Sequence, residues 1–223
     1  MSSKTSQLPS LSFENAFFQS GIRFIIGIDE VGRGSIAGPV AVGAALIDVQ
    51  INTSGWPEKL KDSKLISEKT REIIFSDVAN WVKGWAVGMA SSVEIEQQGI
   101  VTALSLAGSR ALEELLADSG LRSHLATDGV QIILDGSHNW LGPKAMGIPV
   151  AVKTKADRDC VSVAAASVLA KVTRDRLMVE LEESFPGYGF ASNKGYASAT
   201  HIAGLKEKGI SPIHRNSWLS KII

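Results

Sequence analysis

The chain has 223 residues, with 23 basic and 23 acidic side chains, so its formal charge at neutral pH is zero. This length suits one main domain with a full core, because domains usually hold about 100–200 residues. The balanced charge does not by itself indicate a nucleic-acid partner. The single cysteine, Cys160, excludes an intrachain disulfide and favours a reducing compartment.

The distribution of apolar residues does not indicate a membrane protein. The first ten residues hold no continuous apolar segment typical of a signal peptide, and no uncharged run reaches the ~18 residues that suggest a membrane span. We therefore expect a cytoplasmic protein. The charges are unevenly spread: residues 1–152 hold 12 basic against 16 acidic side chains, and residues 153–223 hold 11 against 7. A basic last third would suit a polyanion held against an acidic metal site.

The N-terminal part of the chain leads into its most informative stretch. Residues 1–20 are serine-rich and predict a flexible arm, with three phenylalanines covering one edge of the core. The apolar run at residues 24–28 predicts a strand buried on both faces. Asp29 and Glu30 follow it, and then the glycine-rich sequence GRG at residues 32–34, which we call the GRG turn.

Two adjacent carboxylates at a strand end call for a counter-charge if they are buried. Successive strand side chains point to opposite faces. Asp29 and Glu30 can therefore serve one site only if the backbone turns there or one residue offers its carbonyl oxygen. Two buried like charges are costly, and a hard divalent ion such as Mg²⁺ would remove that cost.

The remaining elements predict a mixed sheet with helices packed on it. Ser67 is expected to cap the first helix of this part, and Gly99 is expected to interrupt the second. The fourth strand ends in Asp135 and Gly136. The expected strands cover residues 39–49, 83–91, 130–134 and 149–152. One expected helix begins after Ser67, two others cover residues 93–117 and 161–183, and short helices and loops are expected from residue 185 onward.

A four-carboxylate cluster is geometrically reasonable in such a sheet, because sites form beyond strand ends. Asp29, Glu30 and Asp135 lie at strand ends, and Asp157 or Asp159 lies at the start of the last long helix. Either of the last two could instead be a simple N-cap, which composition favours. Four acids holding two Mg²⁺ or Mn²⁺ ions are a recurrent solution for phosphodiester hydrolysis.

Several motifs in order resemble one family, the type 2 ribonucleases H, and within it the bacterial ribonuclease HII type. The resemblance covers residues 24–218. It rests on GIDEVGRGSIAGPV at residues 27–40, DSK at 62–64, LDG at 134–136, KAD at 155–157, AAASVLAK at 164–171, YGF at 188–190, KGY at 194–196 with His201, and IHR at 213–215.

The resemblance implies a ribonuclease H-like α/β fold, with a mixed five-stranded sheet in a catalytic domain at residues 21–183 and a small helical substrate-binding extension at 184–223. It assigns metal binding and catalysis to Asp29, Glu30, Asp135 and Asp157, in preference to Asp159. It implies that the GRG turn, formed by Gly32, Arg33 and Gly34, reads the ribose 2′-hydroxyl, and that Tyr196 packs against the next sugar.

The implied activity is cleavage of the RNA strand of RNA/DNA hybrids, and cleavage 5′ to a single ribonucleotide in duplex DNA, by a monomer with two Mg²⁺ or Mn²⁺ ions. Lys64 and Lys194 are phosphate-contact candidates. The sequence departs from the usual family pattern at Ser35, Ile36, Leu65, Asn193, Ala197, Ser198 and Trp218. None of these departures touches the four acids.

Three other interpretations are open to test. Residues 32–37 formally match the dinucleotide fingerprint G-x-G-x-x-A, but that motif needs a helix N-terminus, whereas Pro39 and a strand-like run follow here. A non-catalytic nucleic-acid-binding module would leave the four acids without a reason beyond capping and solvation. A junction-cutting or transposase-like nuclease of the same fold would share the acids but not the GRG turn with Tyr196.

Overall fold

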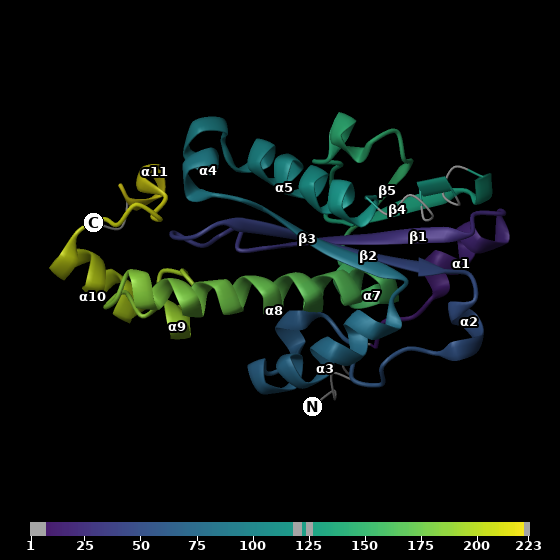
Figure 1. Ribbon diagram of the computed structural model, residues 1–223, viewed down its shortest axis with the longest axis horizontal. Helices are drawn as coiled ribbons and strands as arrows, with labels where there is room; N and C mark the ends of the chain where they lie inside the picture. Colours follow the sequence, from purple (N-terminus) through teal and green to yellow (C-terminus); the bar gives the residue numbers. More distant parts are fainter. Residues whose placement is uncertain (1–7, 118–121, 124–126, 221–223) are drawn as a thin grey trace, which may run out of the picture.

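The structure is a computed structural model that describes residues 8–117, 122–123 and 127–220. Its centre is one five-stranded sheet with the strand order β3-β2-β1-β4-β5 (Figure 1). Three strands form an antiparallel meander, the fourth strand pairs with β1 in parallel, and the fifth pairs with the fourth in parallel. The mixed sheet predicted from the sequence is therefore confirmed. The strands are β1 (Phe24–Val31), β2 (Val40–Asp48), β3 (Gly84–Ala90), β4 (Val130–Asp135) and β5 (Val150–Lys153).

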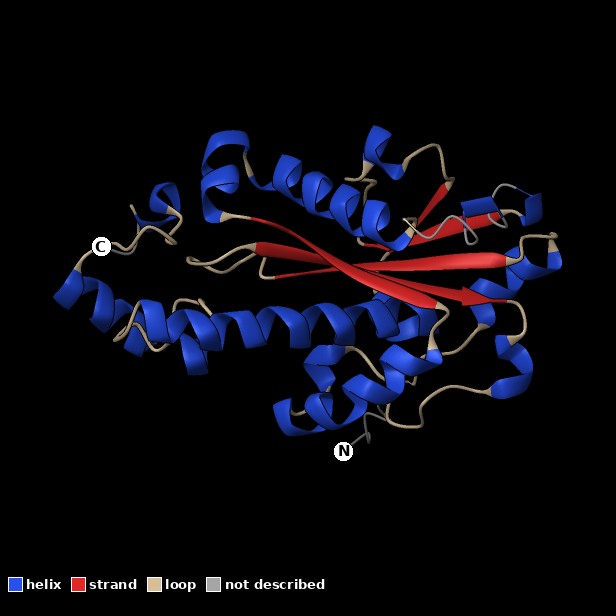
Figure 2. Cartoon of the chain, viewed as in Figure 1, coloured by secondary structure: helices blue, strands red, loops and turns tan. Residues whose placement is uncertain are grey.

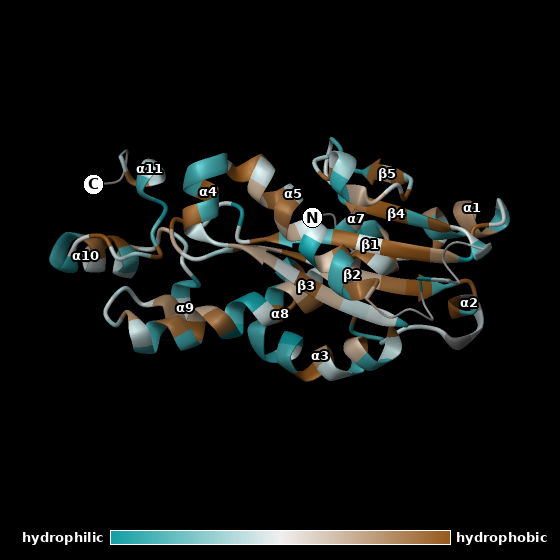
Figure 3. Cartoon of the chain, turned by 45° about the horizontal axis from the view of Figure 1, so that its top comes forward, coloured by the Kyte–Doolittle hydropathy of each residue, from teal (hydrophilic) through white to brown (hydrophobic). Residues whose placement is uncertain are grey.

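Helices cover both faces of the sheet, so the molecule has three layers (Figures 1 and 2). The helices α4 (Ser92–Gln98) and α5 (Ile100–Leu115) cover one face, and α3 (Glu68–Trp81) and α8 (Val161–Ser184) lie on the other. Figure 3 shows the central strands mostly in hydrophobic colours. Every residue of β2 is buried, as expected for a strand covered on both sides.

The long helix α8 crosses the sheet at unusually short range. A Cβ atom at Gly27 of β1 would lie 2.2 Å from the carbonyl carbon of Ser162, so only glycine fits there. The first turns of α8 are built from small residues, among them Ala164, Ala165 and Ala166, which are fully buried. This close contact fixes the start of α8 against the strand that carries Asp29.

The described part of the predicted flexible arm at residues 1–20 contains a helix, and residues 1–7 of that arm lie outside the described residues. Residues 12–19 form helix α1 (Ser12–Gln19), and Phe13, Phe17 and Phe18 pack on the core as expected. The buried Glu14 carboxylate accepts hydrogen bonds from the Ser162 N–H at 3.0 Å and the Ser162 hydroxyl at 2.9 Å. It thereby satisfies a free amide in the first turn of α8.

The prediction that Asp157 or Asp159 caps α8 is wrong. Neither Asp157 nor Asp159 is its N-cap: Cys160 occupies that position without a side-chain cap, and the two acids lie in a separate short helix, α7 (Ala156–Asp159). The capping carboxylate comes instead from Glu14, 148 positions away in the sequence.

The other local predictions are confirmed. The Ser67 hydroxyl caps α3 by accepting from the Thr70 N–H, and Gly99, at φ +79°, separates α4 from α5. No helix in the described part of the chain is long and apolar enough to cross a membrane. The remaining short elements are α2 (Ile51–Ser54), η1 (Ser63–Leu65), η2 (Gly142–Ala145), α9 (Phe190–Asn193), α10 (Ala199–Lys208) and α11 (Asn216–Leu219).

Candidate active site

Three of the predicted acids lie at one end of the sheet. The parallel ladder between β1 and β4 ends with Ile28 opposite Leu134, and Asp29 and Asp135 are the next residues of the two strands. Carboxyl ends of parallel strands meet at one edge of a sheet. Asp157 joins them from α7, because the Ala156 N–H beside it donates to Asp135 Oδ1 at 2.7 Å.

Asp29 and Glu30 differ in their surroundings. β1 continues in register with β2 as far as Val31, so the backbone does not turn between the two acids and their side chains leave opposite faces of the strand. Asp29 is only 3 % exposed. Glu30 is half-buried and accepts a 3.3 Å contact from the Arg33 guanidinium. Because the backbone does not turn, Asp29 and Glu30 can serve one site only if one of them also offers its backbone carbonyl oxygen.

Burial makes the Asp29 carboxylate hard to ionise. Desolvation raises its pKa well above the ordinary value, and the nearby carboxylates of Glu30 and Asp157 raise it further, against the Lys64 ammonium that lowers it. The pKa of Asp135 is also raised, first by burial and then by the Asp157 carboxylate, against the hydrogen bond from the Ala156 N–H that lowers it. This end of the sheet therefore holds more negative charge than it readily stabilises.

Lys64 is the cation that the chain itself supplies to the acids. Its Nζ atom lies 3.0 Å from Asp157 Oδ2. Burial alone would lower the pKa of Lys64, but the carboxylates of Asp29 and Asp157 outweigh it and raise the pKa overall. The Lys64 side chain is therefore a charged ammonium at neutral pH.

The carboxylate oxygens of the acids are suitable ligands for a hard divalent ion, although the side chains are not already arranged in the geometry of a metal site. Within the described ranges, no three Asp, Glu, His or Cys side chains already lie in a metal-binding group. The available donors are carboxylate oxygens, the ligands that Mg²⁺ and Mn²⁺ prefer, and the buried, destabilised charge of Asp29 would be stabilised by such an ion. An ion on Asp157 has to compete with Lys64.

A cavity of about 230 Å³ opens beside the acids and brings together most of the predicted substrate residues. Its lining includes the whole GRG turn, Lys64 and Tyr196. Arg33, Gly34 and Tyr196 are exposed, whereas Gly32 is buried. Glu30, Val31, Ser63 and Lys171 complete the lining, and the sequence analysis had given no role to Ser63 or Lys171.

Two fully buried arginines hold the GRG turn from behind. Arg215 donates to the carbonyl oxygens of Gly32 at 2.8 Å and Arg33 at 2.9 Å, and to that of Gly38 at 3.1 and 3.2 Å. Arg174 donates to the carbonyls of Pro39, Lys194 and Ala37 and to the Ser35 hydroxyl. Neither guanidinium forms an ion pair among the described residues.

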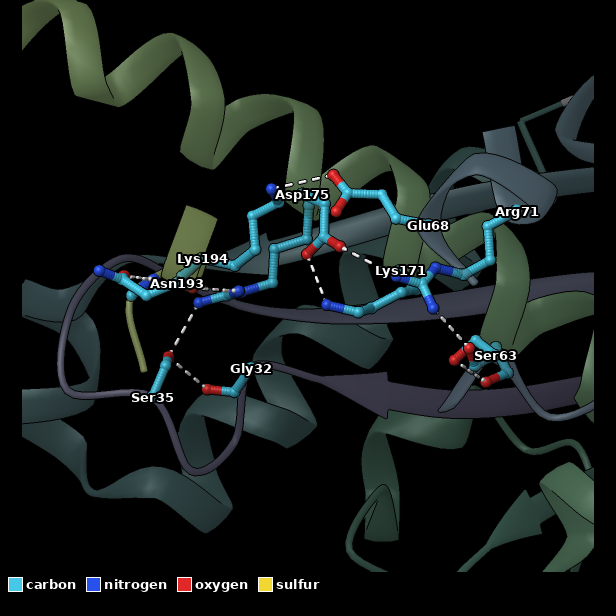
Figure 4. A network of polar contacts seen from close by, with 12 residues as sticks. Gly32, Ser35, Ser63, Glu68, Arg71, Lys171, Asp175, Asn193 and Lys194 are labelled. Atoms are coloured by element: carbon cyan, nitrogen blue, oxygen red, sulfur yellow. Dashed lines mark hydrogen bonds and ion pairs between the residues drawn. The ribbon is translucent and has the colours of Figure 1, made fainter. Parts of the chain in front are cut away.

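Ser35 explains one departure from the family pattern. Its hydroxyl donates to the Gly32 carbonyl at 2.8 Å and accepts from Arg174 at 2.8 Å (Figure 4). The hydroxyl thus joins the turn to the arginine behind it. Gly32 itself must be glycine, because its φ is +78° and a Cβ atom would lie 2.1 Å from Arg174 Nε.

Lys194 is the predicted substrate-binding residue that the structure does not bring into the cavity. Its side chain is buried, and its ammonium forms an ion pair with Glu68 at 3.0 Å and donates to the Ala191 carbonyl (Figure 4). The residue contributes its backbone instead, since its carbonyl accepts from Arg174 at 2.9 Å.

Lys171 reaches the cavity from α8 as part of a charged network (Figure 4). Its ammonium lies 2.6 Å from Asp175, which faces Arg71 at 3.9 Å, and Arg71 donates to the Ser63 carbonyl at 2.7 Å. Burial lowers the pKa of Lys171, and Asp175 opposes that shift. Its place at the end of the motif AAASVLAK was the signal that could have identified it.

The sheet order, the helical layers and the acids at the strand ends define the ribonuclease H fold class. A comparison with solved structures supports this fold class. The structure of ribonuclease H2 from Pyrococcus horikoshii OT3 superposes with a TM-score of 0.63 and 26 % identity, covering 89 % of this chain and 96 % of that one.

Sequence comparison narrows the class to one family. The family model for ribonuclease HII matches residues 26–221. Ribonuclease HII of Streptomyces avermitilis is 45 % identical over 201 residues, which is 89 % of this chain and 78 % of that protein. That of Paracoccus denitrificans is 40 % identical over 210 residues, covering 94 % and 91 %. The chain belongs to the ribonuclease HII family, and it is an endoribonuclease that hydrolyses the RNA strand of RNA/DNA hybrids with divalent metal ions.

Proposed function

We propose that this enzyme, besides cutting RNA/DNA hybrids, cuts duplex DNA on the 5′ side of a single embedded ribonucleotide and leaves 3′-hydroxyl and 5′-phosphate ends. The observation that carries this proposal is the cavity in which the GRG turn, Lys64 and Tyr196 meet beside Asp29 and the other acids. A site that senses one ribose needs close backbone contact with the 2′-hydroxyl, the feature that distinguishes RNA from DNA.

Gly34 supports this role of the turn. Its backbone has no positive φ, and a Cβ atom there would meet nothing within 4 Å. Neither conformation nor packing within the described chain therefore requires glycine at this exposed position. Its missing side chain leaves room for a group from outside, which suits a sugar lying against the turn.

Tyr196 forms the other wall of the cavity. Its ring is exposed, with the Arg174 guanidinium 5.9 Å from the ring centroid. We assign it to packing against the deoxyribose that follows the ribonucleotide. Lys64 and Arg33 are positioned to bind backbone phosphates, and Lys171 is a further cation on the same cavity wall.

We assign Asp29, Glu30, Asp135 and Asp157 to the binding of two divalent ions, Mg²⁺ or Mn²⁺. Such ions supply activation of the attacking water and stabilisation of the leaving oxygen. The chain's own contribution is to hold the acids at the strand ends through the β1–β4 ladder and the contact between Ala156 and Asp135. Lys64 neutralises Asp157 when no ion is bound there.

We place the activity in DNA replication and ribonucleotide excision repair, in the cytoplasm, and carried out by a monomer. In this proposal residues 21–183 form the catalytic part and residues 184–223 help to bind the substrate. The supporting observation is that the segments at 195 and 213–215 bond directly to the backbone after the GRG turn.

The decisive experiment is cleavage of a labelled DNA duplex that carries one ribonucleotide, with Mg²⁺, with Mn²⁺ and with chelator. We expect a metal-dependent cut immediately 5′ to the ribonucleotide. Cleavage of a continuous hybrid without a cut at the single ribonucleotide would overturn the role of the GRG turn. No cleavage of either substrate would favour a binding module.

Tyr196→Ala tests the sugar contact. We expect this variant to lose cleavage at a single ribonucleotide by about tenfold more than at a long hybrid, the value of one stacking contact of 1–2 kcal/mol. Tyr188→Phe is a suitable control, because Tyr188 is buried and its hydroxyl only contacts the Gly209 carbonyl. Equal losses on both substrates in Tyr196→Ala would contradict the assignment.

A further inference from the structure

Two histidines form a buried pair behind Tyr196, in the C-terminal part of the chain. His201 of α10 and His214 are 0 % and 3 % exposed. Their Nε2 atoms lie 2.9 Å apart. The rings of Tyr188 and Phe190 pack edge-on against them, at 4.8 Å from His214 and 5.1 Å from His201. The chemistry described so far uses neither histidine.

The hydrogen bonds at the two ends of the pair determine its protons. At one end, His201 Nδ1 lies 2.9 Å from the Tyr196 carbonyl oxygen. A carbonyl can only accept, so this nitrogen carries a proton. At the other end, His214 Nδ1 lies 3.0 Å from the Ser211 backbone N–H and 2.7 Å from the Ser211 hydroxyl, both of which can donate to it, and 3.3 Å from the Ser211 carbonyl oxygen, which is the longest of the three contacts. A backbone N–H can only donate, so that nitrogen carries none.

The hydrogen bond between the two Nε2 atoms is consistent with the proton positions deduced at Nδ1 of each ring. In a neutral pair, His201 Nε2 is then the acceptor and His214 Nε2 the donor, which gives one continuous chain of hydrogen bonds from Ser211 through both rings to Tyr196. A proton added to His201 would place two N–H groups against each other at Nε2, and a proton added to His214 would place an N–H at Nδ1 against the Ser211 N–H. Burial lowers the pKa of both histidines, to about 4 for His214, which keeps the pair neutral at pH 7.

This chain of bonds ties together two segments that also hold the backbone after the GRG turn. The Gly195 carbonyl, next to Tyr196, accepts from the N–H groups of Ile36 and Ala37 at 2.9 and 3.2 Å. His214 forms a bridge with Ala37, and its neighbours bond residues 36 and 38. The histidines therefore close a loop of contacts between Tyr196 and the GRG turn.

We propose that His201 and His214 are positioning residues that hold Tyr196 at a fixed distance from the GRG turn, and so set the preference for a single ribonucleotide over a continuous hybrid. This inference rests on the proposed function of Tyr196. A continuous hybrid offers ribose at every position of one strand, so it depends less on the placement of one sugar contact.

Two amide substitutions at one position separate the two bonds of His201. In His201→Asn the amide nitrogen takes the place of Nδ1 and keeps the bond to the Tyr196 carbonyl. In His201→Gln the longer amide reaches His214 and leaves that carbonyl without its donor. Leu205→Ala is the control for a general loss of packing around the histidines. Leu205 is buried in the apolar cluster that contains Tyr188 and Phe190, and its side chain forms no hydrogen bond with the histidine pair.

The measurement is the ratio of kcat/KM on a single-ribonucleotide duplex to kcat/KM on a hybrid. We expect His201→Gln to lower this ratio about fivefold, the value of one neutral hydrogen bond, while His201→Asn and Leu205→Ala keep it within about twofold of the parent. The same ratio in the Asn and Gln variants, or an equal fall in Leu205→Ala, would overturn the proposal.

An NMR measurement on the unmodified protein tests the pair independently of activity and of any variant's folding. Long-range ¹H–¹⁵N spectra at pH 7 should show neutral rings protonated at Nδ1 in His201 and at Nε2 in His214. Other tautomers, or a charged ring, would overturn the inference. If these tautomers are found but the unmodified enzyme does not cut at a single ribonucleotide, the proposed function fails while the hydrogen-bond chain stands.

Discussion

The acid end of the sheet and the backbone of the GRG turn are neighbours, yet they treat buried charge in opposite ways. At the acid end, Asp29 is buried beside other carboxylates, and its charge is only partly balanced by Lys64. Behind the turn, Arg174 and Arg215 are buried without a carboxylate partner among the described residues, but their N–H groups are bonded to carbonyl oxygens.

This difference in how buried charge is balanced suits the acid end to bind an ion and suits the two arginines to position the GRG turn. A buried anion whose charge is incompletely balanced attracts an ion from outside, so the acids are suited to hold metal. A buried guanidinium whose three nitrogens all donate hydrogen bonds is fixed in place and fixes its partners in turn. The first region should therefore tolerate loss of charge and lose activity, whereas the second should lose stability.

The largest expected effect is that of Asp29→Asn on catalysis. We expect cleavage to fall by at least about 10³-fold, because a ligand of the metal site is lost, while the metal-free protein is at least as stable as the parent at pH 8. Because the pKa of Asp29 is raised on folding, ionisation costs stability, and this cost grows as pH rises from the unfolded pKa to the folded one.

Thermal unfolding in chelator and hybrid cleavage with Mg²⁺ measure the two effects of Asp29→Asn. A clear loss of metal-free stability would show that the Asp29 charge is balanced by the protein. Full activity would exclude Asp29 from the metal site. Asp159→Asn is the matched control, because Asp159 pairs with Lys153 at 2.9 Å and is not among the charges that shift the Asp29 pKa.

Arg215→Met should show the reverse pattern, with stability as the main loss. It leaves the carbonyls of Gly32 and Arg33 without this donor, and we expect a loss of about 3 kcal/mol in the free energy of unfolding by urea. Arg215→Lys should recover only part of it, because one ammonium cannot reproduce the guanidinium fork.

Arg176→Met is the control for Arg215→Met, since Arg176 is also an arginine but is exposed and pairs on the surface with Glu72. Its change should stay within about 0.5 kcal/mol. Equal stability of Arg215→Met and the parent would refute the positioning role of the buried guanidinium.

Acid should weaken the C-terminal part of the molecule through the histidine pair. The pKa of His214 is lowered to about 4 by burial and by His201, so the unfolded chain binds the proton more readily. Stability is then complete above the unfolded pKa of about 6.5 and is lost as pH falls towards 4.

Between pH 7 and pH 5 this histidine should cost about 2 kcal/mol of unfolding free energy. Urea unfolding at the two pH values, compared between the parent and His214→Gln, isolates the contribution from that of the carboxylates. A parallel pH dependence in both proteins would mean that His214 is not the group responsible.

The smallest effect concerns Lys64, which links the two regions. Lys64→Met should strengthen Mn²⁺ binding about fivefold in calorimetric titration without substrate, because it removes the ammonium that competes at Asp157. The same variant should bind a hybrid more weakly, since it loses a phosphate contact. Unchanged or weaker Mn²⁺ binding would show that the ion and the ammonium do not compete.

Patterns with a short range in sequence predicted most of the fold. Alternation and apolar runs located β2 to β5 within one residue at each end, whereas β1 continues three residues beyond the predicted run, and a single glycine at position 99 marked the helix break. Asp29, Glu30 and Asp135 were proposed as site residues because they follow apolar strands, whereas the choice of Asp157 over Asp159 came from the family resemblance. Hydrogen bonding to backbone groups decides such local structure, so the sequence reports it directly.

Contacts between distant segments could not be predicted in the same way. Nothing in the local sequence shows that Glu14 caps α8, that the Lys194 ammonium turns to Glu68, or that Arg174 lies under the GRG turn. Each of these side chains reads as a solvated charge until the fold brings its partner near. The GRG turn was recognised from its glycines, but the reason for its shape lies 140 to 180 residues further along.

The dependence of the GRG turn on residues 213–215 has a consequence for synthesis of the protein. The sheet and its acids are complete in sequence once α7 and the start of α8 have been made. Arg215 and the bridge between Ala37 and His214 can form only when the ribosome has added the segment that carries them. A nascent chain would therefore hold the proposed catalytic acids before it holds the groups that we propose to shape its choice of substrate.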